Sequence, residues 1–127
     1  MSANKNFTLI SNQIKKYRPK IYVITNKDIY KKIKKKFNKS KTKIKNDFKS
    51  LKSNLRPSDI TISAIPGIAG LEPTISMIKL SKKLLIANKE SIICGWSIIN
   101  KISIKYNTKI VPIDSEHFSI LKLLENH

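Results

Sequence analysis

The chain has 127 residues, and its 26 lysines and arginines outnumber its 8 acidic residues to give a net charge of +18. Its length allows one small core that buries roughly two-thirds of the surface exposed by the unfolded chain. The single cysteine, Cys94, excludes an internal disulfide and a cysteine-rich metal cluster. The N-terminus lacks the apolar core of a secretory signal, and no apolar stretch approaches the roughly 20 residues that span a bilayer. We therefore expect a soluble protein of the cytoplasm.

The positive charge is concentrated in the first half of the chain. Residues 1–57 carry 18 Lys and Arg against 2 acidic residues, whereas residues 58–127 carry 8 against 6. Such an excess can attract nucleic acid. However, the sequence shows neither interleaved aromatic residues nor a recognised nucleic-acid-binding motif beside the lysines. We interpret the excess as a solvated face, and a basic nucleic-acid-binding or repurposed interaction module is the alternative.

The spacing of apolar residues predicts the elements of the first half. It indicates a helix over 10–17, a buried strand over 21–24 and a second helix over 28–37. In the second helix, the lysines fill the side opposite the apolar face. A short edge strand over 41–44 and a short helix over 47–55 are expected next.

From residue 59 onward, the pattern predicts strands and helices in strict alternation. Strands are expected over 60–65, 83–87 and 109–113, and helices from about 71 to 80, 88 to 106 and 115 to 124. The β-branched run over 60–65 is typical of a strand buried on both faces of a parallel sheet. The alternation predicts the α/β class, with an incomplete doubly wound (Rossmann-like) parallel sheet and flanking helices.

The turns that follow the strands are the expected places for functional residues, because ligands of such sheets bind beyond the carboxyl ends of the strands. The first turn, residues 64–71, reads Ala-Ile-Pro-Gly-Ile-Ala-Gly-Leu. Its small residues would let backbone amides approach a ligand, and the following helix start favours an anion. A tight turn that needs glycine explains the same pattern.

The second turn contains Asn88, Lys89 and Glu90 after an apolar strand. Asn88 can cap the next helix, and Glu90 is a favourable acid in its first turn, so a purely structural explanation exists. Lys89 is not explained in this way. A cation at the positive end of a helix is unfavourable unless an anionic group lies nearby.

The third turn contains Asp114, Ser115, Glu116 and His117. In an extended stretch, Asp114 and Glu116 would point to the same side, and their carboxylates suit Mg²⁺ or Mn²⁺. Two carboxylates and a hydroxyl do not complete an octahedral site, so other oxygen ligands would be needed. A capped helix with solvated acids is the alternative explanation, and His117 has no firm role.

Taken together, the three turns carry a family resemblance. In order and spacing, AIPGIAGLEPT, LIANKESIICG and VPIDSEHFSI resemble successive turns of the 1-deoxy-D-xylulose 5-phosphate reductoisomerase family. YRPKIYVI resembles the preceding strand of that family, and residues 3–6 resemble a short turn that meets the adenosine ribose phosphate. The likeness covers nearly the whole chain, and three ordered matches are far more specific than one.

The resemblance implies an NADPH- and metal-dependent enzyme of isoprenoid biosynthesis. It would rearrange the sugar phosphate 1-deoxy-D-xylulose 5-phosphate at the metal and reduce the product with NADPH to 2-C-methyl-D-erythritol 4-phosphate. The residues that the resemblance places at the cofactor are Asn4, Lys5, Asn6, Asn88 and Glu90.

The same resemblance assigns the other site residues. Lys89 would hold the substrate, and Ser115 and Glu116 would also touch it. Asp114 and Glu116 would ligate the divalent cation, Mg²⁺ or Mn²⁺. Lys89 and Glu116 would thus be the catalytic residues, while Cys94 and Trp96 are expected to pack within their helix.

The sequence also departs from the family pattern. It shows neither the first strand with its glycine-rich pyrophosphate loop nor the later metal and phosphate ligands. We therefore expect a fragment, with residues 1–108 a partial NADPH-binding domain and 109–127 the start of the metal-binding catalytic domain. Alone it should be inactive and prone to aggregate. Its expected partners are the missing portions of the enzyme or a second copy of the chain, with no membrane partner.

Overall fold

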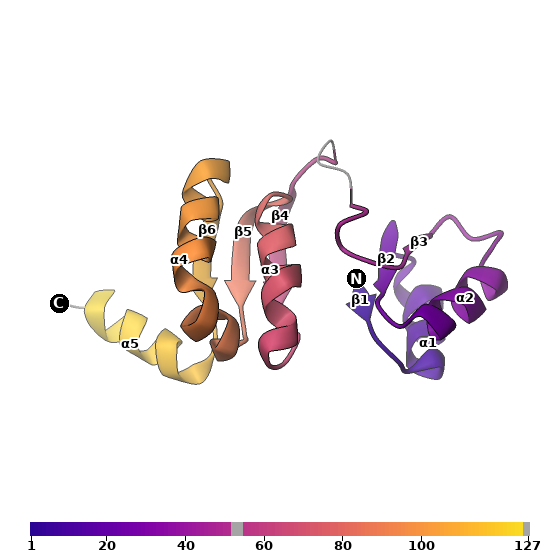
Figure 1. Ribbon diagram of the computed structural model, residues 1–127, viewed down its shortest axis with the longest axis horizontal. Coiled ribbons are helices and arrows are strands. Elements are labelled where there is room, and N and C mark those ends of the chain that lie inside the picture. The colour runs from indigo at the N-terminus through magenta and orange to yellow at the C-terminus, as the bar shows by residue number, and fades with distance from the viewer. Residues whose placement is uncertain (52–54, 126–127) are drawn as a thin grey trace. The chain divides into compact units, whose positions relative to one another are not determined.

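The computed structural model describes residues 1–51 and 55–125. It divides into two compact units, Met1–Lys52 (unit 1) and Ser53–His127 (unit 2). Each unit contains a three-stranded sheet, with strand orders β1-β2-β3 and β4-β5-β6 (Figure 1). All pairings are parallel. The predicted α/β class, with parallel strands and flanking helices, is confirmed.

Unit 1 alternates short strands with two helices. Its elements are β1 (Ser2–Ala3), α1 (Phe7–Tyr17), β2 (Ile21–Ile24), α2 (Lys27–Lys36) and β3 (Lys43–Lys45). The predicted strand over 21–24 is confirmed, and the two helices and the edge strand lie within a few residues of their predicted bounds. The two-residue strand β1 was not predicted, because it is too short to show an apolar periodicity.

The core of unit 1 joins both helices to the central strand. It consists of Ile10, Ile14, Tyr22, Ile24 and Ile33. Ile10 and Ile14 are four residues apart, so α1 turns one apolar side inward. The strand β2 is buried on both faces, because Val23 is only 3% exposed.

Unit 2 has the longer elements. They are β4 (Ser58–Ser63), the 3-10 turn η1 (Ile68–Gly70), α3 (Leu71–Ile78), β5 (Ser81–Ile86), α4 (Lys89–Tyr106), β6 (Lys109–Pro112) and α5 (Ser115–Glu125). Ile78, Leu84, Ile86 and Ile99 form the core, so α3 and α4 cover the same face of β5. Among the described residues, none of the helices is long and apolar enough to cross a lipid bilayer.

The opposite face of β4 is not covered, so the prediction of a strand buried on both faces was wrong. Ile60 and Ile62 are 59% and 64% exposed. Ser63 lies on the covered side, where its hydroxyl is 2.6 Å from that of Thr74. A β-branched run indicates a strand, but the run alone does not show how many of its faces are buried.

Two further expectations were also wrong. Residues 47–51 form a turn in place of a helix, and the Asp47 carboxylate accepts a hydrogen bond of 2.6 Å from the Ser50 amide; residues 52–54 of the predicted helix lie outside the described residues. Local hydrogen bonding by Asp and Ser competes with helix formation, which explains the turn.

Cys94 and Trp96 lie on α4, but both are exposed instead of packed as expected.

Candidate functional site

The carboxyl ends of β5 and β6 bring two of the predicted turns together. Ile86 pairs with Pro112 in the parallel register, and the Ile113 amide donates a 2.8 Å hydrogen bond to the Ile86 carbonyl. Both strands therefore end at the same edge of the sheet, where the chain enters α4 and α5. This parallel arrangement confirms the geometry on which the prediction of a shared site depends.

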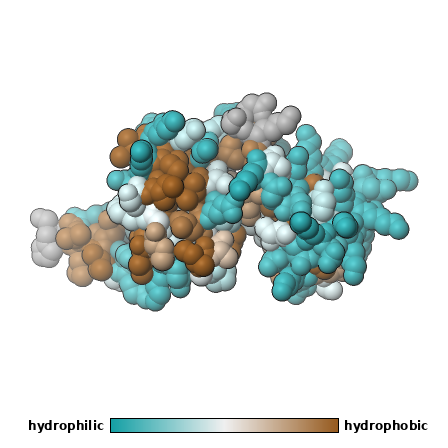
Figure 2. All heavy atoms as spheres, viewed as in Figure 1, coloured by the Kyte–Doolittle hydropathy of each residue, from teal (hydrophilic) through white to brown (hydrophobic). Residues whose placement is uncertain are grey.

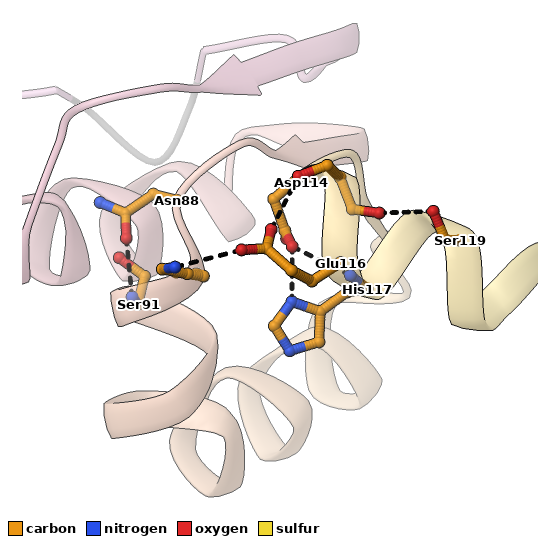
Figure 3. A network of polar contacts seen from close by, with 8 residues as sticks. Asn88, Ser91, Asp114, Glu116, His117 and Ser119 are labelled. Carbon is orange, nitrogen blue, oxygen red and sulfur yellow. Dashed lines mark hydrogen bonds and ion pairs between the residues drawn. The ribbon is translucent and has the colours of Figure 1, made fainter.

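At this edge, Lys89 forms an ion pair with Glu116. Lys89 Nζ lies 3.1 Å from Glu116 Oε1, and the two side chains are about half exposed. Figure 3 shows Glu116 beside Asp114 and His117 at the start of α5. The hydrogen bond to Glu116 raises the pKa of Lys89, and the charges of Glu116, Glu90 and Asp114 add to this shift. The ion pair explains how a cation is tolerated at the start of α4, since an anionic group does lie nearby.

Glu116 is held as a carboxylate by three donors. Its own backbone N–H, the Ser115 hydroxyl and Lys89 lower its pKa to about 2. The Ser115 hydroxyl donates to Oε2 at 2.9 Å, while Lys89 contacts Oε1. Glu116 is therefore negatively charged at any physiological pH.

Asp114 is the most enclosed acid of the cluster, with a side chain only 8% exposed. Its Oδ1 accepts a 3.0 Å hydrogen bond from the His117 amide and lies 2.6 Å from His117 Nδ1. Burial raises the pKa of Asp114, but the hydrogen bonds from His117 and its ring charge outweigh burial and lower the pKa. Its Oδ2 is buried without a hydrogen-bond partner.

His117 is a site residue that sequence reasoning did not assign. It follows Asp114 by three residues, the spacing at which a side chain at a helix start accepts from the backbone. That spacing could have indicated the amide contact. The ring contact depends on the side-chain conformation, which the sequence does not show.

Asn88 fastens the first predicted turn to α4. Its Oδ1 accepts a 2.8 Å hydrogen bond from the Ser91 amide, which confirms the predicted helix cap. Its Nδ2 donates to the carbonyls of Ile65 and Gly67. The side chain is buried, so its polar atoms stabilise the turn and the helix start at this sheet edge.

Two glycines allow the turn to approach Asn88 closely enough for these hydrogen bonds. Gly67 has a positive φ of 68°, a conformation that side chains disfavour. At Gly70, an added Cβ would collide with the Ile65 carbonyl and the Asn88 amide nitrogen. The turn thus needs glycine at Gly67 for its backbone conformation and at Gly70 for close packing, which supports the structural explanation of this segment.

The other predicted cofactor residues lie in different surroundings. Glu90 is exposed in the first turn of α4, whereas Asn4, Lys5 and Asn6 are exposed residues of unit 1. Asn6 caps α1, because its Oδ1 accepts a 2.9 Å hydrogen bond from the Leu9 amide. Five of the predicted site residues do lie together at the sheet edge of unit 2: Asn88, Lys89, Asp114, Ser115 and Glu116.

The donor chemistry of this edge fits a hard divalent cation. Asp114 and Glu116 supply carboxylate oxygens, and the buried, unpartnered Oδ2 of Asp114 has the lone pairs that a cation would use. In the part of the chain that the structure describes, no three His, Cys, Asp or Glu side chains gather as a metal site. A cation here would need further oxygens from a ligand or water, as the sequence indicated.

A parallel α/β fold with polar turns at the carboxyl ends of its strands is the architecture of a Rossmann-like dinucleotide-binding domain. Comparison with protein families is consistent with this class: residues 1–95 match the model of 1-deoxy-D-xylulose 5-phosphate reductoisomerase. Because this match covers well over half of the chain, the chain belongs to the 1-deoxy-D-xylulose 5-phosphate reductoisomerase family.

Individual relatives agree with the family match. The reductoisomerase of Pelagibacter ubique (strain HTCC1062) is 41% identical over 130 residues, which cover 100% of this chain and 34% of the relative. That of Wolbachia pipientis subsp. Culex pipiens (strain wPip) is 37% identical over 99% of this chain and 33% of the relative. The chain thus spans about a third of the length of these relatives.

Solved structures share the fold. The reductoisomerase of Zymomonas mobilis in complex with NADPH matches 91% of this chain and 31% of its own, with a TM-score of 0.77 and 28% identity. A reductoisomerase in complex with NADPH, fosmidomycin and magnesium matches 91% of this chain and 29% of its own, with a TM-score of 0.80 and 26% identity.

Proposed function

We propose that this chain contributes the NADPH-binding and first metal-binding parts of a 1-deoxy-D-xylulose 5-phosphate reductoisomerase. The reaction is the NADPH-dependent rearrangement and reduction of 1-deoxy-D-xylulose 5-phosphate to 2-C-methyl-D-erythritol 4-phosphate. The observation that carries the proposal is the ion pair between Lys89 and Glu116, which lies beside Asp114 at one edge of a parallel sheet. Family membership supports it, because the solved relatives bind NADPH and magnesium.

In this proposal, Lys89 holds an anionic oxygen of the sugar phosphate. The ammonium group is half exposed and already faces a carboxylate, so it can exchange part of that contact for a ligand. Because its pKa is raised, Lys89 stays protonated at neutral pH and binds as a cation. Ser115 and Glu116 contact the same substrate through the hydroxyl and carboxylate that now bond to each other.

Asp114 and Glu116 would hold the divalent cation, Mg²⁺ or Mn²⁺. When bound, the cation supplies Lewis acidity that polarises the carbonyl and hydroxyl oxygens of the substrate. His117 keeps the Asp114 side chain in place through Oδ1 and leaves Oδ2 available as a ligand. Such orientation by a second residue is common for metal-binding carboxylates.

The cofactor roles belong to the proposal as well. Glu90, and Asn88 at the start of α4, would border the nicotinamide, and residues 4–6 the adenosine end of NADPH. Asn88 would act mainly through the turn that it fastens, since its amide is occupied. We also propose that residues 1–108 are part of the NADPH-binding domain and that 109–127 begin the catalytic domain. A cytoplasmic location and a homodimer, or assembly with further parts of the enzyme, complete the proposal.

A chimera tests the proposed function directly. The matching third of the Pelagibacter ubique relative is replaced by this chain, and NADPH oxidation is measured with 1-deoxy-D-xylulose 5-phosphate and Mn²⁺. We expect an active chimera in which Lys89→Met and Glu116→Gln each reduce kcat/KM by about a hundredfold or more, because both residues position reacting groups.

The matched control is a second exposed ion pair at the opposite end of the same sheet. Lys82 Nζ lies 2.8 Å from Asp59 Oδ1, near the starts of β5 and β4. Lys82→Met and Asp59→Asn should leave kcat/KM of the chimera within about threefold, since exposed ion pairs contribute little to stability. A folded chimera without activity, or equal losses in both pairs, would contradict the proposed function.

A further inference from the structure

The solvent face of α2 is a surface of exposed lysines. All six lysines of the helix are exposed: Lys27, Lys31, Lys32, Lys34, Lys35 and Lys36. The apolar residues of this segment, Ile29, Ile33 and Phe37, turn inward and pack in the core of unit 1. We propose that this lysine face binds the phosphate backbone of a nucleic acid duplex without regard to sequence, a property separate from the proposed catalytic function.

The helix dipole accounts for only half of these charges. The three lysines of the last turn favourably face the negative end of the helix, but Lys27, Lys31 and Lys32 do not. Lys27, Lys31 and Lys35 follow one another at intervals of four residues, so like charges lie about 6 Å apart along the helix. Such pairs destabilise a helix unless an anion relieves their repulsion.

Carboxylates in the described part of the chain do not provide that relief. Over residues 1–51 and 55–125, no lysine of α2 forms an ion pair with an acidic side chain. Lysines that do pair with a carboxylate include Lys82 with Asp59, Lys89 with Glu116 and Lys122 with Glu125, and none of these lysines belongs to α2. Lys36 has local partners, since it donates to the Ser11 hydroxyl at 3.4 Å and lies over the Phe7 ring. Lys34 also lies near a ring, that of Tyr30, and the remaining four lysines are available to an external anion.

The composition of the face favours nucleic acid over a membrane. An interfacial helix buries its apolar side in lipid, whereas the apolar side of α2 is already used in the protein core. Figure 2 agrees, because the visible surface of unit 1 is mostly hydrophilic. A row of exposed lysines instead fits a polymer with regularly spaced phosphates, where binding releases counterions.

A duplex fits the face better than a single strand does. Proteins that bind single strands stack bases on exposed aromatic rings. The aromatic residue within α2, Tyr30, is half-buried, and Lys34 lies 5.4 Å from its ring centre. Lysines that contact phosphates position a protein without reading bases, so no sequence preference is expected.

Two matched double variants test the proposal. Lys31→Glu with Lys35→Glu reverses two exposed charges four residues apart on α2. Lys101→Glu with Lys105→Glu makes the same change on α4, where both lysines are also exposed and four residues apart. Binding of the full chain to a fluorescent duplex of about 20 base pairs is measured by anisotropy between about 50 and 200 mM salt, and circular dichroism verifies folding of each variant.

We expect the unchanged chain to bind the duplex with a steep salt dependence. The α2 variant should bind at least about tenfold more weakly, with a log–log salt slope smaller by about 2, because two phosphate contacts are lost. The α4 variant should change affinity less than about threefold.

Three results would overturn the proposal. One is equal weakening by the two variants, which would mean that net charge alone determines binding. Another is no binding by the unchanged chain at about 100 mM salt. The third is tighter binding to phosphatidylserine vesicles, or to a single strand of the same length, than to the duplex.

Discussion

Lys89 and Glu116, 27 residues apart in the chain, join the starts of α4 and α5 through a contact of 3.1 Å. The contact is possible because β5 and β6 are parallel neighbours that end at the same sheet edge. It also changes both groups, raising the pKa of Lys89 and helping to lower that of Glu116. Each consequence can be measured.

Removing the Lys89 ammonium group should raise the pKa of Glu116 only part of the way to its ordinary value. Lys89→Met should raise the pKa of Glu116 above about 2 but leave it below 4.5, because the backbone N–H and Ser115 still donate. Carboxyl carbon chemical shifts in an NMR titration report this value. Glu90→Gln is the control, since Glu90 acts on Lys89 only through its charge. An unchanged Glu116 titration in Lys89→Met would contradict the contact.

The same shift predicts how stability depends on pH. Glu116 has a lower pKa folded (about 2) than unfolded (4.5), so it stabilises the fold above pH 4.5 and this contribution is lost as the pH falls toward 2. Glu116→Gln should therefore lose less stability than the unchanged chain between pH 5 and pH 2. Urea unfolding at both pH values measures the difference. Parallel losses in the two proteins would show that Glu116 is not linked to folding.

Replacing the Asn88 amide with a carboxylate should destabilise the fold. Asn88→Asp keeps the acceptor for the Ser91 amide but replaces the donor to Ile65 and Gly67 with an oxygen facing two carbonyls. We expect a loss of about 2–4 kcal/mol in the free energy of unfolding, since buried groups lose their partners.

The control for Asn88 is Asn26, which caps α2 only as an acceptor from the Asp28 and Ile29 amides. Asn26→Asp keeps those contacts and should change the free energy of unfolding by less than about 0.5 kcal/mol. Thermal and denaturant unfolding of both variants provide the comparison. Similar effects of the two changes would mean that Asn88 is only a helix cap.

The uncovered face of β4 should promote self-association. Ile60 and Ile62 lie exposed on a strand that pairs only with β5 in the described part of the chain. Ile60→Thr with Ile62→Thr keeps β-branched residues but removes apolar surface at an open edge, and should lower the aggregated fraction severalfold. Light scattering measures that fraction. The control, Ile93→Thr on the exposed side of α4, should have a smaller effect; an equal effect would rule out β4 as the cause.

The apolar pattern predicted most of the fold correctly because helices such as α1 and α2 bury one apolar side and β2 is a continuous apolar run. The strand over 21–24 and the cap at Asn88 are examples where a local pattern determined the outcome. The turn at 47–51 and the exposure of Ile60 were missed, because competing side-chain hydrogen bonds and the covering of a second sheet face are not visible in local spacing.

Sequence reasoning about the site had the same limit. The juxtaposition of Lys89 with the third turn followed from strand order alone, because parallel strands end at one edge. The contact between His117 and Asp114, and the two carbonyls that hold Asn88, depend on side-chain conformation and on a turn 21 to 23 residues away. Local sequence spacing determines neither of these contacts.

Locating the Mn²⁺ site on this chain is the most direct test of the proposed function. In an NMR titration, the paramagnetic ion should first broaden the amide signals of residues 114–117 and of Lys89, and Asp114→Asn should abolish this effect while Asp59→Asn should not. Broadening that begins at Asp59, or that survives Asp114→Asn unchanged, would contradict a cation site at the shared edge of β5 and β6.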